Sequence, residues 1–308
     1  MNNNAKHLNR HGIKVKKGDI LNGKYLVLSH ISSGGMSEVY LIEEIANPEK
    51  RWAVKITKIS NPLSKNILDE TNILSELDHP NMPYVVDFFT ADECYFLVME
   101  YIDGVALSDY FTIHNQQLPL ELTIEIAKQL CDVLEFLHAR KPYPIIYRDV
   151  KPGNILIKED HTIKLIDFGT ARKYQENGLS DTASIGTVGF AAPEQFEKKR
   201  TDQRTDLFSF GALLYYLLSK GKYVYVAQKP IKSFHSSLPK SLEKCVLKLV
   251  EIEPNNRIQS TAETRKLLLN AENELRKSKN RFNLNRFGSF SLFSISLLFI
   301  GFLIFTVI

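Results

Sequence analysis

The chain has few cysteines, no leader-like start and no repeats. Its three cysteines, Cys94, Cys131 and Cys245, lie far apart and lack the spacing of a metal site. An odd number of widely spaced cysteines with apolar neighbours favours buried, reduced thiols in a cytosolic domain. The first 20 residues contain no apolar core and no small-residue cleavage site, so a secretory signal is not supported. No internal repeat or low-complexity tract precedes the C-terminal end.

The excess of positive charge is small, with a net charge of +4, and much of it lies near the two ends. A hydrophobic content of 44% and a charged content of 24% are ordinary for a globular protein. The second basic cluster precedes an apolar segment, so a membrane surface explains it better than nucleic acid, and we expect no nucleic-acid partner. The clusters are His7, Arg10, Lys14, Lys16 and Lys17, and then Arg276, Lys277, Lys279, Arg281 and Arg286.

The apolar segment is residues 287–308, which contain no charge. As a helix it would be about 33 Å long, enough to cross a bilayer. A buried core helix is the alternative, but basic residues precede the segment and no polar partner sequence follows it. We therefore predict a single-pass C-terminal anchor, with the basic cluster and the preceding domain on the cytoplasmic side.

The first third of the chain has the pattern of a small sheet with one helix. Apolar residues near one helical face predict a helix at residues 63–77. A turn at Asn47-Pro48 is expected to join the second and third strands. Runs rich in β-branched and aromatic residues predict strands at 25–28, 39–42, 52–56, 84–89 and 95–99.

Beyond Asp103-Gly104 the pattern becomes helical. Spacings of three and four predict a long amphipathic helix around residues 126–137, whereas residues 207–218 are apolar nearly all round, as in a central helix. Further helices are predicted at 238–250 and 262–277. The expected organisation is a polar tail (1–23), a small lobe (24–100), a hinge (100–104), a large lobe (105–270), a basic juxtamembrane segment (271–286) and a transmembrane helix (287–308).

Residues 147–169 concentrate groups suited to moving a phosphoryl group. Asp149 can accept a proton and Lys151 can neutralise a phosphate, while Asn154 and Asp167 can offer oxygens to Mg²⁺. Two short apolar runs around a polar turn predict a β-hairpin between these groups. Such a hairpin would hold metal ions and an attacking hydroxyl in line.

This stretch reads Tyr-Arg-Asp-Val-Lys-Pro-Gly-Asn and then Asp-Phe-Gly, and it resembles the protein serine/threonine kinases, specifically the eukaryotic-like kinases of bacteria. The resemblance covers roughly residues 24–270. It implies an α+β, two-lobed protein-kinase-like fold, with a small antiparallel β lobe carrying one helix and a larger helical lobe. It also implies transfer of the γ-phosphoryl group of ATP to Ser or Thr of protein substrates, with Mg²⁺ or Mn²⁺. Together with the predicted C-terminal anchor, the need for cytosolic ATP places this activity at the cytosolic face of a membrane, expected to be the bacterial plasma membrane.

Residues 31–40 look like the family's glycine-rich loop, in which backbone N–H groups approach phosphate oxygens. Ser32 and Ser37 stand where the family's first and third glycines usually lie. A Gly-Gly pair between strands is more often a plain turn, but its place upstream of Ala53-Val54-Lys55 favours the phosphate loop. The resemblance assigns nucleotide contacts in this loop to Ile31, Ser32, Ser33, Gly34, Gly35, Met36 and Val39.

Lys55 lies in an otherwise apolar strand, where an unpaired ammonium would be costly. The resemblance implies that Lys55 contacts the α- and β-phosphates and pairs with a helix glutamate. Glu70 is the expected partner because it precedes His79-Pro80-Asn81 at the family's usual interval. Glu76 is the alternative glutamate on the same helix.

Residues 99–102 resemble the hinge whose backbone binds adenine, which places Glu100 and Ile102 at the nucleotide. By the same resemblance, Leu156 lies on the floor of the adenine pocket with Val39 and Ala53 above it. Each of these residues could equally be ordinary core.

The resemblance gives catalytic roles to the hairpin residues. Asp149 would orient and deprotonate the substrate hydroxyl, and Lys151 would stabilise the transferring phosphoryl group. Asp167 would bind Mg²⁺ and Asn154 would complete a second metal site. Tyr147 replaces the commoner histidine, which has a packing role in relatives.

The segment from Thr170 to Ala192 resembles an activation loop that ends at Ala192-Pro193-Glu194. Arg148 is where relatives receive a phosphate from this loop. Thr187 is expected to shape the substrate platform. The predicted sites of autophosphorylation are Ser180, Thr182 and Ser184, and the predicted structural residues are Arg148, Glu194, Asp206 and Arg257.

Two other readings compete with an active protein kinase. A pseudokinase, a tethered binding module without turnover, gains from the two missing glycines but loses because all four groups are present: Lys55, Asp149, Asn154 and Asp167. A small-molecule phosphotransferase with the same fold is disfavoured by Ala-Pro-Glu and by the Gly186-Thr187 segment, which build a peptide-binding platform in kinases. Tethering would raise the effective concentration of kinase domains, so a transient kinase–kinase dimer is a further hypothesis.

Overall fold

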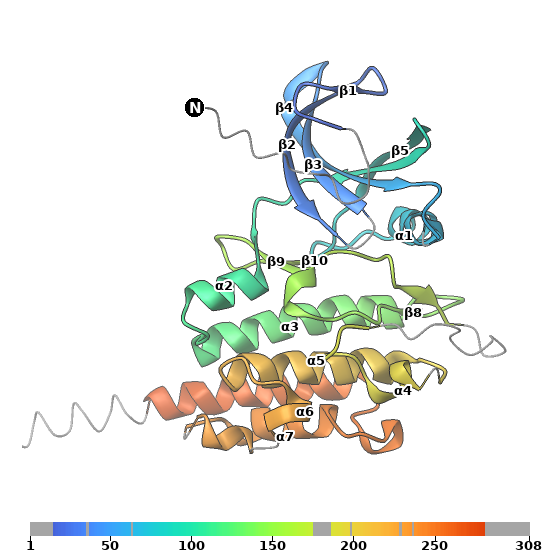
Figure 1. Cartoon of the computed structure of the whole chain (residues 1–308). Helices are drawn as coiled ribbons and strands as arrows, with labels where there is room; N and C mark the ends of the chain where they lie inside the picture. The colour runs from blue at the N-terminus through green and yellow to red at the C-terminus, as the bar shows by residue number, and fades with distance from the viewer. Residues whose placement is uncertain are drawn as a thin grey trace, which may run out of the picture.

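The structure is a computed structural model that describes residues 15–34, 37–62, 64–174, 186–197, 199–227, 230–235 and 237–280. These residues form two lobes (Figure 1), with a twisted β-sheet and helix α1 above a larger, mainly helical lobe. The predicted two-lobed fold is confirmed.

The small lobe is built on a six-stranded sheet in the order β1-β2-β3-β4-β6-β5, in which neighbouring strands run antiparallel. Its own apolar core includes Tyr25, Ile42 and Val54, all almost fully buried. Buried side chains alternate with less buried ones at the start of β2 and along β3, and this period of two is what the sequence pattern showed. The strands are β1 Ile20–Leu21, β2 Tyr25–Ser33, β3 Ser37–Glu44, β4 Asn47–Lys58, β5 Val85–Ala91 and β6 Cys94–Glu100.

The turn between β3 and β4 lies at residues 45–46, so its predicted location at Asn47-Pro48 was wrong. Asn47 instead begins β4 and pairs with Glu44 across a register shift. Proline is tolerated here because this end of β4 extends beyond its first pair with β6, Trp52 with Glu100, so no ladder on that side needs the missing N–H.

Part of the predicted N-terminal tail belongs to the small lobe. In β1, Ile20 pairs with Leu26 and Leu21 pairs with Tyr25. The Tyr40 hydroxyl donates to the carbonyl of Val15 at 3.1 Å. The ordered lobe therefore begins before residue 24. A two-residue strand is too short to show a period, so the sequence pattern did not reveal it.

Helix α1 (Lys65–Ser75) connects the two lobes. Ile73 and Leu74 pack in the core of the large lobe, together with Leu77 and Met82 just beyond the helix. Glu70 is buried on the same helix. The helix that carries this glutamate is therefore fixed against both lobes.

The large lobe is organised around α3 (Leu120–His138) and α5 (Gln203–Leu218). Asp202 caps α5 by accepting a hydrogen bond from the Arg204 N–H at 2.8 Å. A Cβ on Gly211 would lie 2.4 Å from the Leu249 Cβ, so glycine allows α5 and α7 to approach closely. The other labelled helices of this lobe are α2 Leu107–Ile113, α4 Pro193–Phe196, α6 Val224–Ala227 and α7 Lys240–Leu249. Short 3-10 turns lie at Pro152–Asn154, Ile231–Ser233 and Pro254–Asn256.

A last helix is described over residues 261–280, and it extends through the start of the predicted juxtamembrane segment. Leu268 and Ala271 are fully buried, and Lys279 forms a 2.7 Å ion pair with Glu121. The packed domain therefore does not end at residue 270. The basic residues of this helix had suggested a membrane-facing segment, but part of its surface packs against the lobe.

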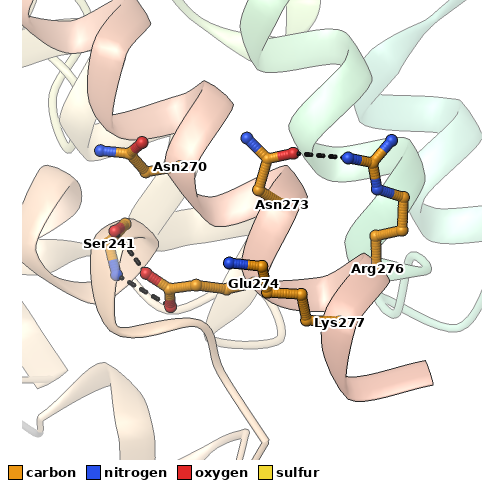
Figure 2. A pocket seen from close by; sticks show the side chains of 6 residues that line it. All are labelled: Ser241, Asn270, Asn273, Glu274, Arg276 and Lys277. Atoms are coloured by element: carbon orange, nitrogen blue, oxygen red, sulfur yellow. Dashed lines mark hydrogen bonds between the residues drawn. The ribbon is translucent and has the colours of Figure 1, made fainter. Parts of the chain in front are cut away.

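A surface cavity of about 540 Å³ lies between this helix and the start of α7 (Figure 2). Its Glu274 carboxylate already accepts the Ser241 hydroxyl at 2.5 Å and the Ser241 N–H at 3.4 Å. Glu274 therefore caps α7 from inside the cavity. The other lining residues are Asn270, Asn273, Arg276 and Lys277.

The predicted membrane helix at residues 287–308 lies outside the described residues. Within the part of the chain that the structure describes, no helix is both long enough and apolar enough to span a bilayer. All three cysteines are buried free thiols, as predicted.

Candidate active site

The candidate site lies where the two lobes meet, around a short hairpin below the sheet (Figure 1). Strand β9 (Ile155–Ile157) pairs with β10 (Ile163–Leu165), as the apolar runs predicted, and β7 (Val105–Ala106) pairs with β9. Beside the hairpin, β8 (Ile145–Ile146) pairs with β11 (Arg172–Lys173). Asp149 and Asn154 precede β9 and Asp167 follows β10, so the hairpin brings the two ends of the motif together.

Asp149 is held by three polar side chains and is almost buried. Its Oδ2 accepts the Lys151 ammonium at 2.6 Å and the Asn154 amide at 2.9 Å. Its Oδ1 accepts the Thr187 hydroxyl at 2.9 Å, and Lys151 also reaches that hydroxyl at 2.8 Å. The carboxylate is therefore fixed in position beside a cation.

Lys55 lies between two carboxylates. Its ammonium is 2.6 Å from Glu70 Oε2 and 2.9 Å from Asp167 Oδ1. Of the two candidate glutamates, Glu70 therefore pairs with Lys55, whereas Glu76 forms an ion pair with Lys173 at 2.7 Å. The second oxygen of Glu70 accepts the backbone N–H of Phe168 at 3.2 Å, which links α1 to the Asp-Phe-Gly segment.

The charges of this cluster follow from its contacts. Burial acts to lower the pKa of Lys55, but the carboxylates of Glu70 and Asp167 outweigh it, and the pKa is raised. Burial acts to raise the pKa of Asp167, but Lys55 outweighs it, and that pKa is lowered. Lys55 is therefore a cation and Asp167 an anion at neutral pH.

The backbone of the catalytic segment is braced from below by Asp206. Its carboxylate accepts the N–H of Tyr147 at 2.9 Å and that of Arg148 at 2.6 Å, and it contacts His138 at 2.8 Å. Arg148 has a φ of 71°, and the Asp206 contact holds it in this left-handed conformation. Asp167 has a φ of 64° at the other end of the hairpin.

Tyr147 packs inside the site. Its hydroxyl donates to the carbonyl of Ile166, and its ring meets Phe168 edge-on at 5.0 Å. Burial raises the pKa of the Tyr147 phenol, which therefore stays neutral. Tyr147 thus connects the catalytic segment to the residue before Asp167.

Side-chain contacts connect β2 and β3, the two strands that flank the glycine-containing loop. Glu38 Oε2 accepts the Ser33 hydroxyl at 2.6 Å and lies 2.7 Å from His30 Nε2. Ser32 pairs with Val39 across the strands, and the Gly34 N–H donates to the Ser37 carbonyl at 2.8 Å. The predicted contact residues Gly35 and Met36 lie outside the described residues, and the predicted contact residue Ile31 is half exposed.

The residues predicted around adenine come from both lobes. Val39 of β3 pairs with Lys55 of β4, and Ala53 of β4 pairs with Met99 of β6. Leu156 is at the middle of β9, and Ile102 is buried just after β6. The Glu100 N–H donates to the Tyr84 carbonyl at 3.0 Å, and its carboxylate binds Lys164.

Asp167 and Asn154 fit the needs of Mg²⁺ better than those of a protein-enclosed metal. Among the described residues, no three His, Cys, Asp or Glu side chains are grouped to hold an ion by themselves. The Asp167 side chain is 49% exposed, although one of its oxygens binds Lys55. Mg²⁺ commonly takes one or two protein oxygens and completes its shell with substrate phosphates and water, which fits this pair.

Residues 186–197, where the description of the chain resumes, lie against the catalytic residues. Gly186 has a φ of 131°, and a Cβ there would lie 2.5 Å from the Ala191 Cβ. Gln195 donates to the Arg148 carbonyl at 2.9 Å and accepts the Ala192 N–H at 2.9 Å. Thr187 is thereby held at Asp149. The predicted phosphorylation sites Ser180, Thr182 and Ser184 lie outside the described residues.

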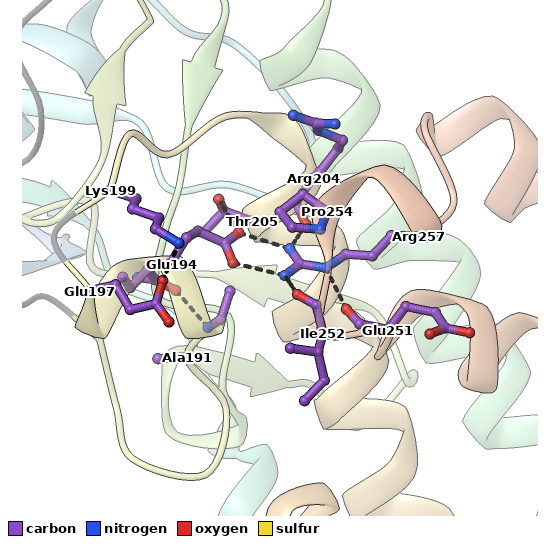
Figure 3. Close-up of polar contacts among 12 residues, drawn as sticks. Ala191, Glu194, Glu197, Lys199, Arg204, Thr205, Glu251, Ile252, Pro254 and Arg257 are labelled. Carbon is purple, nitrogen blue, oxygen red and sulfur yellow. Dashed lines mark hydrogen bonds and ion pairs between the residues drawn. The ribbon is translucent and has the colours of Figure 1, made fainter.

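Glu194 and Arg257 form a two-pronged ion pair inside the large lobe (Figure 3). Both guanidinium NH groups lie 2.7 Å from a Glu194 oxygen. Arg257 also donates to the carbonyls of Glu251, Ile252 and Arg204 at 2.7, 2.8 and 3.0 Å. The pair joins the end of the substrate platform to the last part of the lobe.

Three residues near the site were not singled out from the sequence: Gln195, Asn81 and Lys164. The side-chain amide of Asn81 donates to the Ile163 carbonyl at 2.7 Å, and the backbone carbonyl of Asn81 accepts the Leu165 N–H at 2.8 Å. The His-Pro-Asn motif offered a signal for Asn81. Gln195 directly follows Ala-Pro-Glu, whereas nothing in the sequence pairs Lys164 with Glu100.

Fold and site together define a protein kinase. The chain belongs to that family, since the family described as the protein kinase domain matches residues 25–281. Its relatives include bacterial serine/threonine kinases. It is 32% identical over 264 residues to a probable serine/threonine-protein kinase of Clostridium perfringens, and 28% identical over 285 residues to PrkC of Bacillus subtilis. It is 32% identical over 277 residues to PknB of Mycobacterium tuberculosis.

These three alignments cover 80%, 87% and 82% of this chain. They cover only 38%, 43% and 44% of the relatives, so the chain spans less than half the length of the proteins it matches. Membership of the family therefore does not assign the activities, substrates or partners of those longer proteins to this chain.

Proposed function

We propose that this chain is a protein serine/threonine kinase that uses ATP and Mg²⁺. The observation that carries the proposal is the arrangement around Asp149, where Lys151, Asn154 and Thr187 all contact one carboxylate. A carboxylate fixed next to a cation can accept the proton of a hydroxyl while the cation offsets charge on the incoming phosphoryl group.

In the proposed reaction, the oxygen of a substrate Ser or Thr attacks the γ-phosphorus of ATP and its bond to the β–γ bridging oxygen breaks. Asp149 would accept the hydroxyl proton, and Lys151 would contact the transferred phosphoryl group and offset its charge. Lys55, held by Glu70, would bind the α- and β-phosphates. Asp167 and Asn154 would hold Mg²⁺, which supplies positive charge to the phosphates when bound.

The adenine of ATP would lie between Leu156 below and Val39 and Ala53 above, next to the hinge backbone at Glu100 and Ile102. The loop residues Ile31 to Met36 would cover the phosphates. These roles are supported by the positions of the described residues at the junction of the lobes.

The substrate class is tested by labelled ATP and Mg²⁺ with a generic basic protein as acceptor. We expect acid-stable label on serine and threonine of the protein. Label on a small metabolite alone would instead favour the phosphotransferase reading. Binding of ADP without any transfer would favour the pseudokinase reading.

Autophosphorylation of the segment between Asp167 and Thr187 is part of the proposal. Arg148 is buried next to this segment, where a guanidinium can pair with a phosphate. We expect mass spectrometry of protein incubated with ATP to find phosphate on Ser180, Thr182 or Ser184, and none in an Asp149→Asn variant. An unmodified segment in a fully active preparation would refute this prediction.

Tethering to a membrane is also proposed, on the basis of the uncharged residues 287–308 and the basic residues that precede them. We expect the full chain to sediment with membranes and to be released by detergent but not by high salt. A chain that ends at residue 280 should remain in the supernatant. The same distribution for both chains would contradict the tether.

A further inference from the structure

Lys164, at the middle of β10, uses all three donors of its ammonium group. The ammonium lies 2.8 and 2.7 Å from the two oxygens of Glu100 and 3.2 Å from the Met82 carbonyl. An ammonium has three N–H donors, so each has an acceptor. The Lys164 and Glu100 side chains are only 12% and 22% exposed, so solvent screens this pair less than a surface pair.

The position of Lys164 in the sheet places it at the proposed adenine site. It lies directly opposite Leu156 in the β9–β10 ladder. Opposite residues of an antiparallel pair project to the same face, so the stem of Lys164 lies beside Leu156. Its charged end reaches Glu100, the last residue of β6, where the hinge begins.

The strand that carries Lys164 is itself held firmly. The backbone groups on either side of it, the Ile163 carbonyl and the Leu165 N–H, are both bound by Asn81. β10 is therefore a fixed base, and Lys164 extends from it to the hinge. The Lys164–Glu100 pair joins a strand of the large lobe to the last strand of the small lobe.

We infer that Lys164 is a positioning residue for the nucleotide base, because it fixes the spacing between the hinge backbone at Glu100 and the pocket floor at Leu156. Its side chain contacts Glu100 and the Met82 carbonyl, at the hinge rather than at Asp149 or Asp167. The inference rests on the proposed function, since it assigns the adenine end of the same site. It separates base binding from phosphoryl transfer, which depends on Asp149 and Asp167.

Substitution of Lys164 by Met tests the inference, because Met keeps the length of the stem and removes the charge. We expect the Kd for ADP, measured by calorimetry on the full chain, to rise about tenfold, which is about 1.4 kcal/mol. The KM for ATP should rise in parallel, while kcat at saturating ATP stays within about twofold, because uniform binding is lost without a change at the reacting atoms. Adenosine binding should weaken by the same factor.

Glu100→Gln should weaken ADP binding to a similar degree, and the double variant should be no weaker than either single variant, because the two side chains act as a pair. Lys158→Met is the matched control. Lys158 lies in the turn of the same hairpin with its side chain 40% exposed, and among the described residues its ion pair is with Asp160 at 3.5 Å. We expect its Kd for ADP to be unchanged.

Three outcomes would overturn the inference: an unchanged Kd in Lys164→Met despite a loss of thermal stability, additive effects in the double variant, or a fall in kcat with KM unchanged. ADP binding needs no turnover, so this test is separate from the test of activity. A wild-type chain that binds no ADP would overturn the proposed function, and the inference with it.

Discussion

Replacement of Asp149 by Asn should lower phosphoryl transfer by about 10²- to 10⁴-fold, the range that a general base contributes. Asn keeps the shape of the side chain and can still accept a hydrogen bond from Lys151, 2.6 Å away in the wild type. It cannot take the proton of the attacking hydroxyl, and it removes the negative charge that pairs with Lys151. The loss should therefore appear in kcat.

The measurement is steady-state transfer to a basic protein, with ADP affinity and thermal unfolding recorded for the same preparations. ADP affinity should match the wild type, because Asp149 lies away from the adenine end of the site, and the unfolding record distinguishes a loss of transfer from a loss of folded protein. Asp160→Asn is a matched control: it changes an exposed carboxylate of the same hairpin, which pairs with Lys158 at 3.5 Å and accepts the Thr162 N–H at 2.9 Å, a bond that the Asn carbonyl can keep. A variant at Asp149 that transfers phosphate as fast as this control would refute the assigned role.

Replacement of Glu194 by Gln should destabilise the folded chain by about 3–5 kcal/mol, the cost of leaving a buried charge without its partner. Arg257 is 3% exposed, and its guanidinium cannot lose its proton. In the variant, the amide NH₂ would face one of the two guanidinium NH₂ groups of Arg257, from which the Glu194 oxygens now accept hydrogen bonds at 2.7 Å. The remaining carbonyl contacts of Arg257 do not neutralise its charge.

Urea unfolding of the full chain in detergent measures this loss. Glu197→Gln provides the control, since Glu197 pairs with Lys199 on the surface and its substitution should cost less than about 0.5 kcal/mol. Equal stability of the Glu194 and Glu197 variants would contradict the argument. Any loss of activity in the Glu194 variant should come from displacement of the substrate platform around Thr187, because Glu194 does not contact the described catalytic residues.

The same pair predicts a pH dependence. Burial acts to raise the pKa of Glu194, but the hydrogen bonds and charge of Arg257 outweigh it, and the pKa is lowered. A lowered pKa in the folded state adds stability above the ordinary pKa of a glutamate, and that stability is lost as the pH falls through the folded-state value. The wild type should lose stability in acid more steeply than Glu194→Gln does.

The local parts of the fold and site could be predicted from the sequence. The apolar runs on either side of the turn at residues 158–161 predicted β9 and β10, and with them the closeness of Asp149 and Asp167. The helix at residues 207–218 was found because it is apolar on all sides. In both cases the signal lies within a few residues, and neighbouring side chains determine the local structure.

The missed features depend on contacts between distant segments. The Lys164–Glu100 pair joins residues 64 apart, and no local pattern reveals it. The basic composition of residues 276–279 gave no sign that their helix packs on the large lobe, where Lys279 pairs with Glu121 on α3. The turn at residues 45–46 was displaced because strand pairing with β3 outweighs the turn preference of Asn-Pro.

One rate decides whether this chain is a competent protein serine/threonine kinase. The full chain is incubated with γ-labelled ATP, Mg²⁺ and a basic protein, and labelled phosphoserine and phosphothreonine are counted over time beside the Asp149→Asn variant. We expect steady label in the wild type and a rate at least about a hundredfold lower in the variant. Equal rates in both, or no label from a wild-type chain that binds ADP, would contradict this expectation.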